Sequence, residues 1–174
     1  AHHPNESLLK KVTFAVQLVP DEGVPLGVRR VQQVLREAKR NNGKYASIVL
    51  GCDDIRVHSL GSAALETVVM TNLSDTPHET ASEQLDCLKR LLERTPRYMV
   101  LNHDDESCEE LSDVQVSSKM SYGVHEDAEA HIDDVKLYKK GSELKLVIDH
   151  QTKLRLATHL VGTANLLNLT AAVT

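Results

Sequence analysis

Three groups of polar residues directly follow short apolar runs, where side chains could bind a ligand. They are Gly51-Cys52-Asp53-Asp54, Thr71-Asn72-Leu73-Ser74-Asp75 and Asn102-His103-Asp104-Asp105. In an open α/β sheet, ligands bind beyond the carboxyl ends of the strands, so these amides and carboxylates are candidate nucleotide or metal contacts. Each group also fits a structural interpretation, as a solvated turn or a helix cap.

Other familiar site patterns are missing from the 174 residues. No Gly-x-x-x-x-Gly-Lys-Ser/Thr phosphate loop occurs, and that loop is the cradle that grips ATP phosphates in P-loop enzymes. Cys52, Cys87 and Cys108 are widely spaced, with no Cys-x-x-Cys pair. This spacing argues against a disulfide framework or a zinc ribbon and fits a reducing, cytoplasmic setting.

The apolar patterning predicts the elements that would position these groups. Strands are predicted at residues 11–20, 45–52, 66–72 and 98–102, helices at 26–38, 83–94, 106–111 and 165–173, and an antiparallel ribbon at 130–138 and 144–148. Alternating strands and helices favour an α/β fold, with a mostly parallel sheet flanked by helices and a small antiparallel ribbon.

Length and charge limit the class of protein further. The chain is long enough for one domain over residues 1–174 and has no linker that would split it. A net charge of −5 with scattered Lys and Arg argues against a nucleic-acid partner. No apolar run approaches the roughly 18 residues that a membrane-spanning helix needs, so we expect no membrane segment.

Five segments form an ordered set of motifs, namely residues 68–74, a helix with Glu83 and Lys89, residues 99–105, Ser121-Tyr122-Gly123, and residues 160–168 with their Gly-x-x-Asn-x-x-Asn pattern. In this order they resemble successive motifs of the central domain of ATP-dependent Mur ligases. The resemblance covers roughly residues 24–174. It implies a Mur ligase central domain without its phosphate loop and C-terminal domain.

The resemblance also implies an activity for the parent enzyme. Mur ligases use ATP and Mg²⁺ to join an amino acid or peptide to a UDP-N-acetylmuramyl precursor of peptidoglycan. The partners of this chain would be the missing N- and C-terminal domains and the UDP-muramyl substrate, and the chain alone would be inactive. Two alternatives stay open, namely a non-catalytic interaction module on the same scaffold and a folylpolyglutamate or cyanophycin synthetase-type ligase.

Two residues acquire catalytic and metal-binding roles from the resemblance. Lys89 matches a helix lysine that is carbamylated in many family members and helps to hold magnesium, a metal that prefers oxygen ligands. His78 stands near a histidine of the metal and phosphate site. The structural alternatives are a solvated helix lysine and a surface loop.

Four further residues acquire nucleotide-binding roles in the same way. Asn72 and Asp105 match residues near the nucleotide, and Asn165 and Asn168 match asparagines near the adenine. Asp105 could equally cap the following short helix, and Asn165 could begin its own helix. We expect Asn72, Lys89 and the Asn165/Asn168 pair to meet at one rim of the parallel sheet.

The sequence departs from the family pattern at three positions. Gly51 stands where a magnesium-binding Glu is common, with Asp53 or Asp54 as substitutes from a shifted position. Asp75 and His78 are separated rather than adjacent. Ala164 replaces a histidine often found before the first Asn.

Overall fold

The computed structural model describes residues 15–18, 27–52, 55, 60, 65–73, 80–92 and 97–174. The chain divides into two compact units, Ala1–Ala63 and Ala64–Thr174. Each unit has its own sheet. The prediction that residues 1–174 form a single domain stays a prediction.

The first unit is a strand-helix-strand motif. Strand β1 (Ala15–Leu18) pairs in parallel with β2 (Tyr45–Ile48), and helix α2 (Gly27–Arg40) connects them. The helix buries Val31, Val34 and Ala38 at helical spacing. It ends where Asn42 takes a left-handed φ of 57° and the Gly43 amide donates to the Ala38 carbonyl at 2.7 Å.

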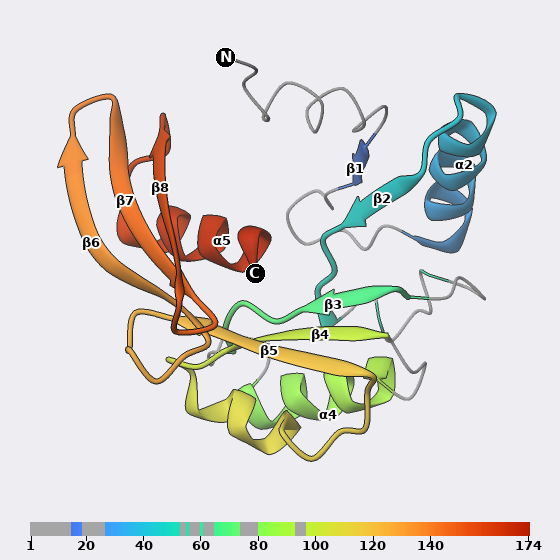
Figure 1. Cartoon of the computed structure of the whole chain (residues 1–174). Helices are drawn as coiled ribbons and strands as arrows, with labels where there is room; N and C mark the ends of the chain where they lie inside the picture. The colour runs from blue at the N-terminus through green and yellow to red at the C-terminus, as the bar shows by residue number, and fades with distance from the viewer. Residues whose placement is uncertain are drawn as a thin grey trace. The chain divides into compact units, whose positions relative to one another are not determined.

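The second unit contains a mixed sheet of six strands in sequence order. Its strands are β3 (Thr67–Val69), β4 (Tyr98–Asn102), β5 (Ser118–Gly123), β6 (Ala130–Tyr138), β7 (Gly141–Ile148) and β8 (Thr152–Thr158). Neighbours from β3 to β6 pair in parallel, whereas β6, β7 and β8 pair antiparallel. The antiparallel ribbon curves away from the parallel strands (Figure 1). The predicted fold class is therefore confirmed.

Helices lie on both faces of the parallel part of this sheet (Figure 1). Helix α4 (Ala81–Leu92) lies on one face with the short 3-10 helix η1 (Glu106–Leu111), and α5 (Thr163–Val173) lies on the other. Helix α4 starts with a capping box, because the Glu83 carboxylate accepts from the Thr80 amide at 2.8 Å and the Thr80 hydroxyl accepts from the Glu83 amide at 3.3 Å. No helix of the described residues has the length and apolarity that crossing a membrane requires.

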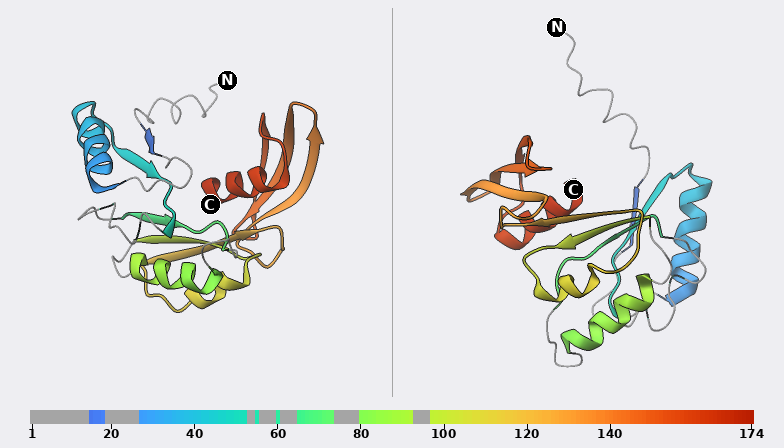
Figure 2. Two further views of the ribbon diagram at one scale, coloured as in Figure 1. Left: turned by 180° about the vertical axis from the view of Figure 1, so that it is seen from behind. Right: turned by 60° about the horizontal axis from the view of Figure 1, so that its bottom comes forward.

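The ribbon has one more strand than its predicted two segments. Strand β8 pairs with β7 from Ser142 to Ile148, and both strands rise beside α5 (Figure 2). Leu154 and Leu156 of β8 pack with Leu166 of α5, while the alternate residues Lys153 and Arg155 are exposed. The segment Thr152–Thr158, in which charged and apolar residues alternate, was not predicted as a strand. Its stability as a strand comes from pairing with β7 and packing on α5.

Candidate functional site

The carboxyl ends of β3, β4 and β5 are joined by a hydrogen-bond network. We call residues 70–73, 102–105 and 122–125 the rim. The buried Tyr122 hydroxyl donates to the carbonyls of Met70 at 3.0 Å and Thr71 at 3.3 Å. The side-chain amide of Asn102 donates to the same Thr71 carbonyl at 2.5 Å. Side chains from β4 and β5 thus hold the backbone that leaves β3.

Asp105 connects two segments of the rim. One carboxylate oxygen accepts from the Leu73 amide at 2.6 Å, and the other accepts from the Ser107 amide at 2.9 Å. The second bond makes Asp105 the N-cap of η1. Both carboxylate oxygens therefore accept hydrogen bonds from backbone amides. Asp105 thus caps the following short helix, which is one of the two roles expected for it. The nucleotide-binding role of Asp105 stays a prediction.

Asp104 connects the rim in the other direction, to the end of β5. Its carboxylate accepts from the Val124 amide at 2.8 Å and the His125 amide at 3.4 Å. Its own amide donates to Asn102 Oδ1 at 3.0 Å. The segment Asn102–Asp105, which follows β4, is therefore hydrogen-bonded to the chain that follows β3 and to the chain that follows β5.

The rim is acidic and contains no lysine or arginine. Burial raises the pKa of Tyr122 to about 12, and Cys108, Asp104 and Asp105 add to the increase. Burial also raises the pKa of the Cys108 thiol to about 11, with a contribution from Asp105. Both groups are neutral at physiological pH. A phosphate group at this rim would need its positive charge from outside these three segments.

Asn72 is the candidate residue most open to a ligand at the rim. Its side chain is exposed, while the backbone on either side is held by bonds to the Thr71 carbonyl and the Leu73 amide. His78 and its neighbour Asp75 lie outside the described residues, as do Asp53 and Asp54.

Lys89 is part of an ion pair. Its Nζ lies 3.1 Å from Glu110 Oε2, which links α4 to η1, and the two side chains are 43% and 62% exposed. A carbamate on Lys89 would place a negative group beside the Glu110 carboxylate. Within the described ranges, no three His, Cys, Asp or Glu side chains come together as metal ligands. Magnesium binding stays a prediction, since Mg²⁺ is commonly held by one or two carboxylates and substrate phosphates rather than by three protein side chains.

Asn165 and Asn168 lie on the first turns of α5. The side-chain amide of Asn165 donates to the Val161 carbonyl at 2.8 Å, and Asn168 is exposed. The chain just before this helix start is held to the ribbon by the Ser142 hydroxyl, which donates to the Leu160 carbonyl at 2.8 Å. Near the other end of α5, Ala171 packs with Val100 of β4 and Tyr122 of β5.

The structure brings together only part of the predicted set. Asn72 and Asp105 share the rim, since Asp105 bonds the residue that follows Asn72. Among the described residues, no hydrogen bond or ion pair joins Lys89, Asn165 or Asn168 to Asn72. The common pocket of these residues stays a prediction.

Sequence reasoning placed Asn102 in a candidate group and Tyr122 in a family motif, but it assigned neither of them its role in organising the rim. One signal was present, because Asn102 is the last residue of the largely apolar β4 and Tyr122 is the second-last residue of β5. Buried polar groups of this kind are almost always hydrogen-bonded.

In open α/β sheets, ligands bind beyond the carboxyl ends of the parallel strands, which is where the polar side chains of the rim lie. Residues 28–174 match the family model of the Mur ligase middle domain. The chain therefore belongs to the Mur ligase middle-domain family.

Its relatives are longer ligases. The chain is 28% identical over 178 residues to the UDP-N-acetylmuramoyl-L-alanyl-D-glutamate--2,6-diaminopimelate ligase of Geobacillus thermodenitrificans (strain NG80-2), a match over 96% of this chain and 32% of the relative. A solved ligase of the same name has a TM-score of 0.77 at 21% identity, over 90% of this chain and 36% of that one. The MurF ligase of Thermotoga maritima in complex with ADP has a TM-score of 0.55 at 11% identity, over 97% and 46%. The chain thus spans about a third of the length of the first two relatives.

Proposed function

We propose that this chain is the middle-domain portion of an ATP-dependent ligase in peptidoglycan synthesis. The parent enzyme would form an amide bond between an amino acid or peptide and a UDP-N-acetylmuramyl precursor. The match of residues 28–174 to the Mur ligase middle domain supports the class of enzyme. The observation that carries the proposal is the rim itself, in which three parallel strand ends are held together and Asn72 is left exposed.

Each rim residue has a distinct part in this proposal. Asp104 and Asp105 bond to backbone amides and so fix the shape of the rim. Asn72 presents an amide that can both donate and accept hydrogen bonds to a nucleotide. When bound, ATP supplies the phosphoryl group that activates the substrate carboxylate. Positive charge for its phosphates would come from other parts of the parent protein, since the rim has no cation.

No step is assigned to magnesium. Lys89 is paired with Glu110, and the described residues hold no cluster of three metal ligands. His78 and Lys89 remain candidates for catalysis and metal binding on the basis of the resemblance. The chain by itself is expected to be inactive, because phosphoryl transfer depends almost entirely on positioning and electrostatic stabilisation by a complete site.

Nucleotide binding by the chain tests the proposal. ADP should raise the melting temperature of the wild type, because a ligand that binds only the folded state stabilises it. Asn72→Ala should reduce this increase, and Gln151→Ala, in an exposed turn of the ribbon, should leave it unchanged. An increase that Asn72→Ala does not alter would remove Asn72 from the site. Magnesium-dependent ATP hydrolysis by the chain alone would disprove its inactivity.

One structural feature favours a second candidate, a non-catalytic interaction module on the same scaffold. The Lys89–Glu110 ion pair gives this lysine a structural partner in place of a metal. A module of this kind would show no shift in melting temperature with ADP or ATP. A folylpolyglutamate or cyanophycin synthetase-type ligase would show the shift, and assays of the parent enzyme with each class of acceptor would separate it from a muramyl ligase.

A further inference from the structure

The outer face of the β6–β8 ribbon is rich in charged residues, with one more cation than acids. The inner face is apolar and packs on α5 through Leu144, Leu146 and Leu166. The outer face has a different composition, with Lys136, Lys145, Lys153 and Arg155 against Asp133, Asp134 and Glu143. Four cations and three acids thus gather here in a chain whose net charge is −5.

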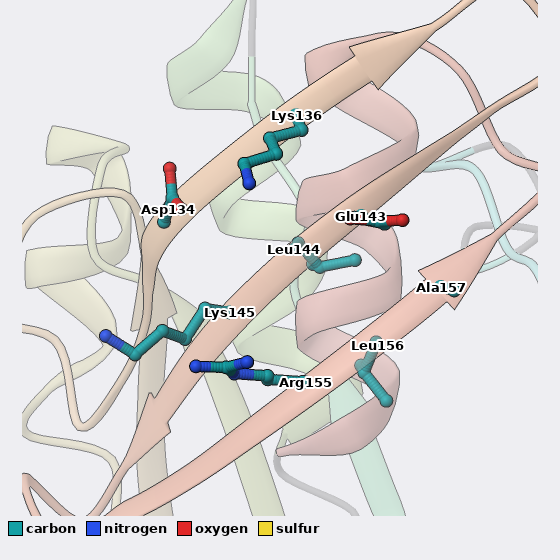
Figure 3. Close-up of a pocket in the computed structure, with 8 residues that line it drawn as sticks. All are labelled: Asp134, Lys136, Glu143, Leu144, Lys145, Arg155, Leu156 and Ala157. Atoms are coloured by element: carbon teal, nitrogen blue, oxygen red, sulfur yellow. The ribbon is translucent and has the colours of Figure 1, made fainter.

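This outer face contains a hollow of about 330 Å³. Lys136, Lys145 and Arg155 line it together with Asp134, Glu143 and Ala157 (Figure 3). Ala157 lies directly opposite Glu143, and its small side chain leaves room beside β8. The volume lies at the lower end of the range for small-molecule sites.

Like charges lie directly opposite each other at the centre of the hollow. Lys145 of β7 pairs in register with Arg155 of β8, and the Arg155 guanidinium points toward Lys145 (Figure 3). Cross-strand like charges destabilise a sheet unless an anion lies between or beside them. Lys145 donates to Asp133 of β6, so the Lys145 ammonium is directed toward β6 and away from Arg155.

Glu143 lies directly opposite Lys136 in the β6–β7 register, but its hydrogen bond is to another residue. The Glu143 carboxylate accepts from the Tyr138 hydroxyl at 3.3 Å, which directs it toward the outer end of the ribbon. Within the part of the chain that the structure describes, neither Arg155 nor Lys136 makes an ion pair. The pKa of Asp133 is lowered mainly by its bond to Lys145 and further by Lys153 and His131.

We propose that the hollow on the outer face of β6, β7 and β8 binds a small anion with two or more phosphate or carboxylate groups, held by Arg155 and Lys136. Arginine presents a planar fork that suits both kinds of group, and lysine adds a point charge. Lys136 is in register with Ala157, two residues away from Arg155 on β8, and β7 lies between the two strands, so the Cα atoms of the two cations lie roughly 12 Å apart. That separation suits an anion with more than one charged group. The site is separate from the rim and does not depend on the proposed ligase function.

The test uses two probes, inorganic pyrophosphate and citrate, at low ionic strength. Binding is measured by calorimetry, and its place by the backbone amide shifts of residues 130–158. Arg155→Gln and Lys136→Gln should each weaken binding about fivefold, as expected for an exposed charge-assisted contact. The matched control Lys140→Gln removes the same charge at the exposed β6–β7 turn, outside the hollow, and should leave the affinity unchanged. The tighter-binding probe identifies the phosphate or the carboxylate class.

A second pair of variants tests the acid that lines the hollow. Asp134→Asn should strengthen binding, because it removes a carboxylate beside the anion. Asp113→Asn makes the same charge change at an exposed position after η1 and should have no effect. Far-UV circular dichroism would confirm that each variant is folded. The proposal is overturned if neither probe binds, if the shifts lie outside the ribbon, or if the variants and their controls change the affinity equally.

Discussion

The carboxylate of Asp104 occupies the space that a side chain at residue 123 would need. A Cβ atom on Gly123 would lie 2.6 Å from Asp104 Oδ1, closer than real Cβ contacts allow. Asp104 cannot simply move away without losing its bonds to the Val124 and His125 amides. The position of the Asp104 carboxylate therefore requires a glycine at residue 123, at the end of β5.

Gly123→Ala should lower the free energy of unfolding by about 1–2 kcal/mol, since it displaces a hydrogen-bonded carboxylate. Urea denaturation measures the loss. Adding Asp104→Ala to Gly123→Ala should cost less than Asp104→Ala costs in the wild type, because the steric conflict is then relieved. Strictly additive losses would show that the two residues do not interact.

Asp105→Ala should lower the free energy of unfolding by about 1–3 kcal/mol, because it removes an N-cap and leaves the Leu73 amide without its partner. Hydrogen exchange should speed up at the amides of Leu73 and Ser107. The matched control is Asp113→Ala at an exposed position, which should change stability by less than about 0.5 kcal/mol. Unchanged exchange at Leu73 would contradict the bridging role of Asp105.

His150→Gly should stabilise the protein by about 0.5–1 kcal/mol. Asp149 and His150 form the β7–β8 turn with φ of 52° and 55°, and the Gln151 amide donates to the Ile148 carbonyl at 3.1 Å. A turn of this geometry favours glycine at its second central position, because histidine is strained there. Asp149→Gly should gain less, since aspartate tolerates a left-handed backbone better. A lower melting temperature for His150→Gly would show that the ring contact with His131, at 6.2 Å between centroids, outweighs this strain.

Stability should fall as the pH rises from about 9 to about 11, because burial raises the pKa of Cys108 from 9.0 to about 11 in the folded state. The unfolded chain releases this proton first, so the contribution is complete below pH 9 and is lost as the pH passes the folded value. Urea denaturation at about pH 8 and about pH 10 measures the slope. Cys108→Ala should reduce the slope, and Tyr122, whose pKa rises from 10.0 to about 12, should account for a remaining decline at higher pH. An unchanged slope would exclude Cys108 as its source.

Local pattern was enough to predict most elements and the family. The spacing of Val31 and Val34 predicted the helix found at Gly27–Arg40, and the short apolar run at residues 98–102 predicted the strand Tyr98–Asn102. These features depend on residues within one or two turns of each other, so periodicity records them. The order of the motifs from residue 68 to residue 168 indicated the family that residues 28–174 match.

Tertiary structure decided what the polar residues contact. Asp105 bonds Leu73 from 32 residues away, and Lys89 bonds Glu110 from 21 residues away. These partners depend on the parallel register of β3 and β4 and on the packing of α4 against η1, which no local spacing encodes. The sequence therefore determined the elements and the candidate residues, whereas only the folded sheet decided that the aspartates of the rim hold its backbone.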